Sequence, residues 1–103
     1  MEYNASAWSP VGGSAGISDG GASTPSLAID STGNLYVAFV DDANSELTTV
    51  MEYTGSSWGI FGSAGFSAGE DFYPSLAITP SGIPVLALGD STISNTVVRE
   101  WVP

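Results

Sequence analysis

PSLAIDSTGNLYVAFV, residues 25–40, returns at residues 74–89 as PSLAITPSGIPVLALG. Each copy is a short apolar run, a turn that closes at Gly33 or Gly82, and a longer apolar run. Glycine in the last position suits a turn that needs positive φ. The two stretches therefore predict the same pair of strands, joined by a tight turn and made twice.

The repetition extends over almost the whole chain. Residues 1–3, 7–8, 13–16 and 25–29 match residues 51–53, 57–58, 62–65 and 74–78. A glutamate followed by an aromatic residue occurs three times, as Glu2-Tyr3, Glu52-Tyr53 and Glu100-Trp101. We interpret the chain as two repeats, cut inside a repeat.

A period of about 50 residues with several strands in each period is typical of β-propeller blades. We expect an all-β fold with two four-stranded blades in one unit, residues 1–103. Blade one covers about 25–66, with strands at 26–29, 35–41, 47–53 and 57–62. Blade two covers about 74–102, with strands at 75–78, 84–89 and 96–102, and a spare fourth strand stands at 7–12. Pro84 falls at a strand start, where a residue without an N–H is tolerated.

The predicted strand at 35–41 carries apolar side chains on both of its faces. Leu35, Val37 and Phe39 point to one face, and Tyr36 and Ala38 point to the other. Such a strand is expected to be covered on both faces.

These residues resemble NHL-type propeller repeats, which run Pro-x-x-[Ile/Leu]-Ala-[Val/Ile]-Asp-x-x-Gly-Asn-[Leu/Val/Ile]-Tyr-Val-Ala. Residues 25–38 follow this pattern nearly throughout, whereas residues 74–87 depart from it at Thr79 and at Ile83-Pro84. The basic residue usual in the third strand of the family is absent. The Ser-Ala-Gly linkers also look like those of repeat arrays in large bacterial surface proteins. The resemblance implies a propeller, usually of six blades.

Two blades cannot close a ring, since propellers have about four to eight. We therefore expect a homo-oligomer closed head to tail, in which residues 7–12 complete blade two of a neighbouring subunit beside Arg99, Glu100 and Trp101. Three copies would give six blades and four would give eight; the homotrimer is preferred, with the homotetramer as the alternative. A natural half-ring, an excised fragment and a designed protein all remain open as origins.

Three tryptophans, Trp8, Trp58 and Trp101, are candidates either for packing between blades or for stacking on a sugar. The chain resembles, in plan but not in motif, small two-blade lectins that trimerise and bind sugar between blades with Trp, Arg and Glu. Arg99 and Glu100 supply those residue types, although strand alternation puts them on opposite faces.

The stretches 18–24 and 67–73 are predicted to link a fourth strand to the next first strand, on a rim where binding loops concentrate. Phe72 and Tyr73 are unmatched in the other repeat, so they join the candidate ligand-binding residues, with sequence drift as the alternative. A calcium loop would space oxygen ligands as Asp42, Asn44 and Glu46 do. The stretch lacks the glycine and distal glutamate of an EF-hand, so a solvated turn is the preferred interpretation, and no metal or cofactor is expected.

The composition of the chain disfavours several classes of function. Eleven acidic residues against one basic residue give a net charge of −10, which disfavours nucleic acid and anionic membranes as partners. His and Cys are absent, and Arg99 is the single basic residue, so the usual general bases and nucleophiles are missing. We expect a structural, self-assembling propeller module rather than an enzyme. The alternative is a carbohydrate-binding lectin, and a glycosidase-like enzyme comes third.

Overall fold

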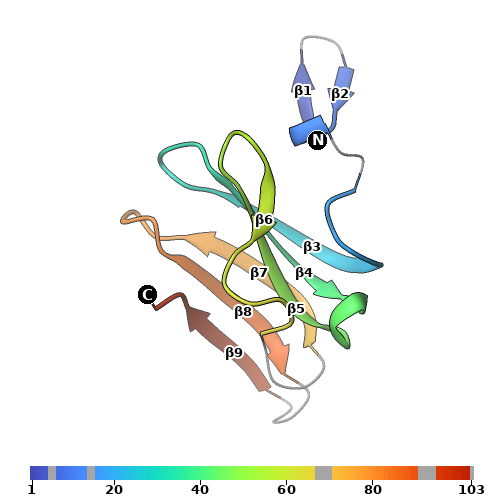
Figure 1. Ribbon diagram of the computed structural model, residues 1–103. Coiled ribbons are helices and arrows are strands. Elements are labelled where there is room, and N and C mark those ends of the chain that lie inside the picture. The colour runs from blue at the N-terminus through green and yellow to red at the C-terminus, as the bar shows by residue number, and fades with distance from the viewer. Residues whose placement is uncertain (5–6, 14–15, 67–70, 91–94, 103) are drawn as a thin grey trace.

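The computed structural model describes residues 1–4, 7–13, 16–66, 71–90 and 95–102. Within these residues the fold is all-β, and every strand pairing is antiparallel (Figure 1). The strands form an N-terminal hairpin and two larger sheets, which we call the first sheet and the second sheet. The hairpin contains β1 (Glu2–Asn4) and β2 (Ala7–Ser9). The first sheet has the order β3 (Ala22–Ile29), β4 (Leu35–Asp41), β5 (Leu47–Tyr53) and β6 (Trp58–Ile60). The second sheet has the order β7 (Asp71–Ile78), β8 (Pro84–Asp90) and β9 (Asn95–Glu100).

Helical structure in the described part of the chain is limited to two short 3-10 segments, η1 (Val11–Gly13) and η2 (Asp42–Asn44). None of the helices in these residues has the length and apolar character needed to cross a membrane.

The predicted strands at 35–41 and 47–53 are confirmed with their bounds, as β4 and β5. The predicted start of a strand at Pro84 is also confirmed. The turn that closes at Gly33 has the expected positive φ of 91°, and the Gly33 amide donates to the Asp30 carbonyl at 3.1 Å. The matching turn closes at Gly82, with a φ of 88°.

The first strand of each sheet begins earlier than predicted. β3 starts at Ala22 and β7 at Asp71, so the ends of the predicted linkers 18–24 and 67–73 are strand. Residues 67–70 lie outside the described part of the chain. Both strands extend past a proline, Pro25 or Pro74, because the pairing register shifts there at a bulge. The residue before each proline has positive φ, 47° at Thr24 and 50° at Tyr73. Proline cannot donate to the ladder, and the bulge lets pairing resume on its other side.

The outer strands are shorter than predicted. β2 ends at Ser9 rather than at residue 12, and β6 covers Trp58–Ile60 rather than 57–62. β2 stops directly before Pro10, which has no N–H to donate, and Gly12 and Gly62, both with a φ of 81°, lie in the turns that follow the two strands. β9 likewise ends at Glu100 rather than at residue 102.

The core lies between the two larger sheets, where β7 packs across β3 and β4 (Figure 1). One polar contact crosses this interface, since the Leu76 amide donates to the Ser26 hydroxyl at 3.0 Å. The buried cluster draws on both sheets and contains Tyr36, Ala38, Val50, Leu76, Leu86 and Leu88.

Candidate interaction faces and inter-sheet pocket

Each sheet has two faces that can be compared through the repeat. We call face A the side that carries small side chains on the first strand, and face B the side that carries Leu and Ile there. In the first sheet, face A carries Ser26, Ala28, Tyr36, Ala38 and Val50, and face B carries Leu27, Ile29, Leu35 and Val37. In the second sheet, the matching positions are Ser75, Ala77, Val85, Ala87 and Val98 on face A, and Leu76, Ile78, Pro84 and Leu86 on face B.

The sheets pack head to tail. Face A of the first sheet, through Tyr36, Ala38 and Val50, meets face B of the second sheet, through Leu76 and Leu86. The two contacting surfaces are therefore different surfaces of the repeat. This leaves face B of the first sheet and face A of the second sheet uncovered by the other sheet.

Exposure of matched residues on the first and third strands shows this asymmetry. Leu27 is 64% exposed, whereas its repeat equivalent Leu76 is 8% exposed. Val98 is 67% exposed, whereas its equivalent Val50 is 5% exposed. In β4 the expectation of cover on both faces is met, since Tyr36 on face A is 5% exposed and Phe39 on face B is 3% exposed. The exposed part of face B lies on β3, at Leu27 and Ile29. The alternation of the strands was predicted correctly, but only one face of each sheet packs on the other sheet.

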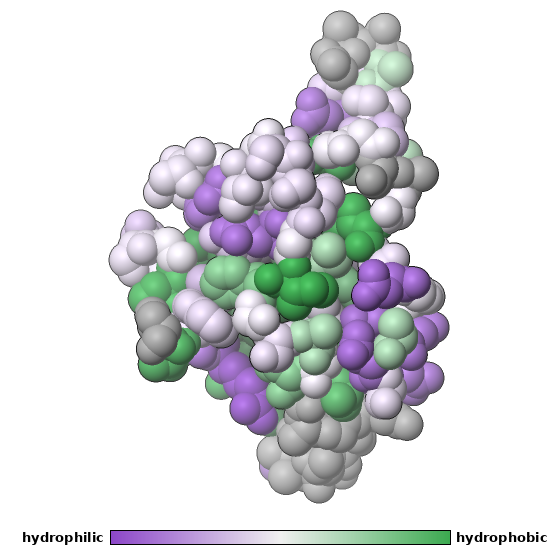
Figure 2. All heavy atoms as spheres, viewed as in Figure 1, coloured by the Kyte–Doolittle hydropathy of each residue, from purple (hydrophilic) through white to green (hydrophobic). Residues whose placement is uncertain are grey.

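An apolar groove lies on face B of the first sheet. It has a volume of about 420 Å³ and is bounded on one side by the segment that follows β2. Figure 2 shows hydrophobic side chains at the surface in the middle of the face in view. The groove is lined mainly by apolar residues, among them Val11, Ile17, Leu27, Leu35, Val37 and Phe39.

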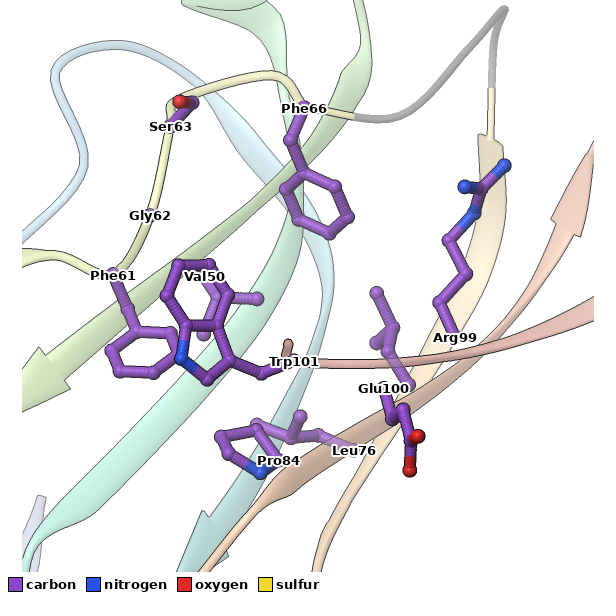
Figure 3. A pocket seen from close by; sticks show the side chains of 11 residues that line it. Val50, Phe61, Gly62, Ser63, Phe66, Leu76, Pro84, Arg99, Glu100 and Trp101 are labelled. Carbon is purple, nitrogen blue, oxygen red and sulfur yellow. The ribbon is translucent and has the colours of Figure 1, made fainter. Parts of the chain in front are cut away.

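A second pocket, of about 440 Å³, lies between the two sheets (Figure 3). Trp101 follows β9 and is held by its amide, which donates to the Pro84 carbonyl at 3.0 Å. Its ring packs on Phe61, with centroids 4.8 Å apart and an interplanar angle of 56°. Phe61 in turn meets Tyr36 edge to face at 5.4 Å. A path of three aromatic rings thus joins the first sheet to the last strand of the second.

Gly62 makes room for the indole of Trp101. A Cβ atom at this position would lie 3.0 Å from the ring, and the φ of 81° is one that side chains rarely adopt. Sequence analysis did not select Phe61 or Gly62 as site residues. The available signal was the Phe-Gly pair at the end of a predicted strand, which precedes the Ser-Ala-Gly linker.

The charged candidates Arg99 and Glu100 both line this pocket together with Trp101. Their side chains leave β9 in opposite directions (Figure 3), as strand alternation predicts. The structure therefore brings all three predicted residues to one pocket, with the guanidinium and the carboxylate on different sides of the strand.

The other predicted ligand-binding residues lie elsewhere. Trp58 packs against Tyr53 at 5.3 Å, and its indole N–H donates to the Val11 carbonyl at 3.0 Å. Trp8 lies in the N-terminal hairpin, 67% exposed, against Tyr3. Tyr73 is exposed at the bulge of β7, and of Phe72 only the backbone, paired with Gly89, lies in the described part.

The predicted oxygen-rich turn at 42–46 is organised by a buried carboxylate that precedes it. Asp41 accepts from the Thr49 hydroxyl at 2.6 Å, the Asn44 amide group at 2.9 Å and the Ala43 amide at 3.2 Å. Asp42 and Glu46 are exposed. Among the described residues, no group of three or more His, Cys, Asp or Glu side chains is placed to hold a metal ion.

Among the titratable groups of the described residues, two have shifted pKa values. Hydrogen bonds, the largest from the Thr32 hydroxyl, hold the pKa of the Asp30 carboxyl below its usual range. Burial, followed by the nearby Glu52, raises the pKa of Tyr36. Asp30 lies in the turn between β3 and β4 and Tyr36 lies on β4, and neither residue lines the inter-sheet pocket.

Comparison with models of protein families, with curated proteins and with solved structures finds no match to this chain.

Proposed function

We propose that the protein is a structural, self-assembling half of a β-propeller, in which each sheet is a blade and copies of the chain close a ring head to tail. The observation that carries the proposal is the exposure of Leu27 and Val98, whose repeat equivalents Leu76 and Val50 are buried against each other's sheets. Apolar faces of this kind mark interaction sites. The contact between the two sheets of one chain is thus a template for the contact between copies.

In the proposed ring, face A of the second sheet of one copy covers face B of the first sheet of the next. The two surfaces differ, so the interface is heterologous and closes only if the rotation per copy divides the circle. Leu27 would take the place of Leu76, and its amide would meet the Ser75 hydroxyl of the preceding copy as the Leu76 amide meets Ser26. Three copies would make six blades and four would make eight, and the resemblance to NHL-type repeats favours three.

The N-terminal strand fits the same arrangement. β9 is an edge strand of the second sheet in the described residues, whereas the matching β5 is covered by β6. β2 matches β6 in sequence, so β2 of one copy would pair with β9 of another as its fourth strand. Trp8 would then stand beside Trp101 as Trp58 stands beside Tyr53.

The experiment that tests this proposal compares two matched variants. Leu27→Ser should leave the dilute chain folded but lower the association constant by about ten- to a hundredfold, since it removes an apolar side chain from the interface between copies. Leu76→Ser should instead lower the free energy of unfolding of the single chain, because Leu76 is already buried. Circular dichroism reports folding and analytical ultracentrifugation reports association. Equal association of Leu27→Ser and the unmodified chain would contradict the proposal.

A second candidate function, carbohydrate binding, is favoured by the inter-sheet pocket. Trp101 supplies an aromatic ring for stacking on a sugar and Arg99 a guanidinium for its hydroxyls, in a pocket whose size suits a small ligand. On a glycan array the chain should bind a sugar, and Trp101→Ala should abolish that binding while the mass of the assembly stays unchanged. Binding that survives Trp101→Ala, or no binding at all, would rule out this pocket as a sugar site.

A further inference from the structure

The N-terminal hairpin reproduces the pairing of the outer two strands of the first sheet. In the hairpin, Glu2 pairs with Ser9 and Tyr3 with Trp8. In the first sheet, the same pairs are Glu52 with Gly59 and Tyr53 with Trp58. β1 therefore lies on β2 in the register in which β5 lies on β6. It occupies the edge of β2 that a third strand of a blade would use.

The third copy of the glutamate-aromatic element lies at the end of β9, as Glu100 and Trp101. In the ring proposed above, on which this inference rests, Glu100 and Trp101 of a second copy must pair with Ser9 and Trp8. Those residues are already paired with Glu2 and Tyr3 of their own chain. The two partners cannot occupy one edge together.

We infer that β1 is an internal occupant of the closing edge, and that assembly proceeds by exchange of β1 for β9 of a second copy. β1 has three residues, and its hairpin projects away from the two larger sheets (Figure 1). A two-stranded hairpin of this kind is marginally stable in water. β9, by contrast, is already ordered along β8, and the Trp101 amide is fixed on the Pro84 carbonyl at 3.0 Å. β9 is therefore the better partner for β2, and β1 weakens and delays association by competing with it.

Two cysteine pairs test the exchange directly, because the unmodified chain contains no cysteine. Glu2→Cys with Ser9→Cys should form a disulfide within one chain and lock β1 on β2. Ser9→Cys with Glu100→Cys, its repeat-matched counterpart, should instead link two chains. We expect the oxidised Glu2→Cys/Ser9→Cys chain to sediment as one chain, and to regain association when a reductant is added.

A third variant keeps the full chain and weakens the competitor alone. Tyr3 meets Trp8 edge to face at 5.9 Å, so Tyr3→Gly removes an aromatic pair from the hairpin. It should raise the association constant by about two- to tenfold. A decrease or no change would overturn the inference, because it would mean that β1 is not displaced.

The failure of this inference differs from the failure of the proposed function. If the unmodified chain never associates, the ring itself is wrong. If the unmodified chain associates and the oxidised Glu2→Cys/Ser9→Cys chain associates equally well, the ring stands and the exchange of β1 is wrong.

Discussion

At the scale of single residues, Asp30 organises the turn between β3 and β4. Its carboxylate accepts hydrogen bonds from the Thr32 amide at 2.9 Å, the Thr32 hydroxyl at 2.7 Å and the Asn34 amide at 3.0 Å. The second repeat has Thr79 at this position, and its hydroxyl accepts from the Ile83 amide at 3.0 Å. A charged and a neutral acceptor thus stabilise the same turn in the two copies, but only the charged one responds to pH.

The lowered pKa of Asp30 predicts the sign of a pH dependence. Because its pKa is lower in the folded than in the unfolded chain, its contribution is complete above the ordinary aspartate pKa of about 4 and is lost as the pH falls through the folded value. Asp30→Asn should therefore reduce the loss of stability between neutral and strongly acidic pH. Urea unfolding of the unmodified chain and the variant at both ends of this range measures the effect.

The control for this experiment is Thr79→Asn, which exchanges one neutral side chain for another in the matching turn. It should leave the slope of stability against pH unchanged. A slope that is the same in Asp30→Asn as in the unmodified chain would show that the hydrogen bonds to Asp30 do not stabilise the ionised form.

At the scale of the elements, the strands in the middle of the first sheet were predictable from sequence. β4 is an apolar run that ends in Asp41, β5 combines apolar residues with two threonines and a glutamate, and no backbone irregularity falls within either strand. β3 and β7 were predicted too short, because both contain a bulge at a residue that is not glycine, Thr24 or Tyr73. Positive φ at such residues carries no signal in a single sequence.

The candidate site was predictable only in part. The three residues that end the third repeat element, Arg99 to Trp101, were selected and do line one pocket. Alternation gave the two faces of each strand but not which face packs on the other sheet. Phe61 was missed because its contact with Trp101 joins segments that are far apart in the sequence.

One contact between elements anchors the segment that leads from the first sheet to the second. The Thr49 hydroxyl on β5 donates to Asp41 on β4 and accepts from the Gly65 amide at 2.8 Å. Thr49 and Asp41 are both buried. Thr49→Val should lower the free energy of unfolding by about 1–3 kcal/mol, because a buried carboxylate loses a partner.

Thermal and urea unfolding measure this change, and Val97→Thr serves as its control. Val97 occupies the position of Thr49 in the second repeat. Val97→Thr, made in the otherwise unmodified chain, should therefore not raise the free energy of unfolding. An effect of Thr49→Val below about 0.5 kcal/mol, the range of ordinary surface substitutions, would contradict this role.

At the scale of the whole molecule, the fold is a pair of matched sheets in which face B of the first sheet and face A of the second are not covered by the other sheet. The sheets, their pairing and their head-to-tail packing are properties of the described chain. The proposed ring would extend that packing to further copies. Because each copy carries a net charge of −10, repulsion opposes association, and salt that screens it should strengthen the assembly.

The most direct test of the central claim is the mass of the unmodified chain in solution, by sedimentation equilibrium at about 0.15 M salt. The ring predicts a closed species of three times the chain mass of 10.5 kDa, or of four times, without larger polymers. A single-chain mass at every concentration up to about 1 mM, where even weak complexes form, would contradict it.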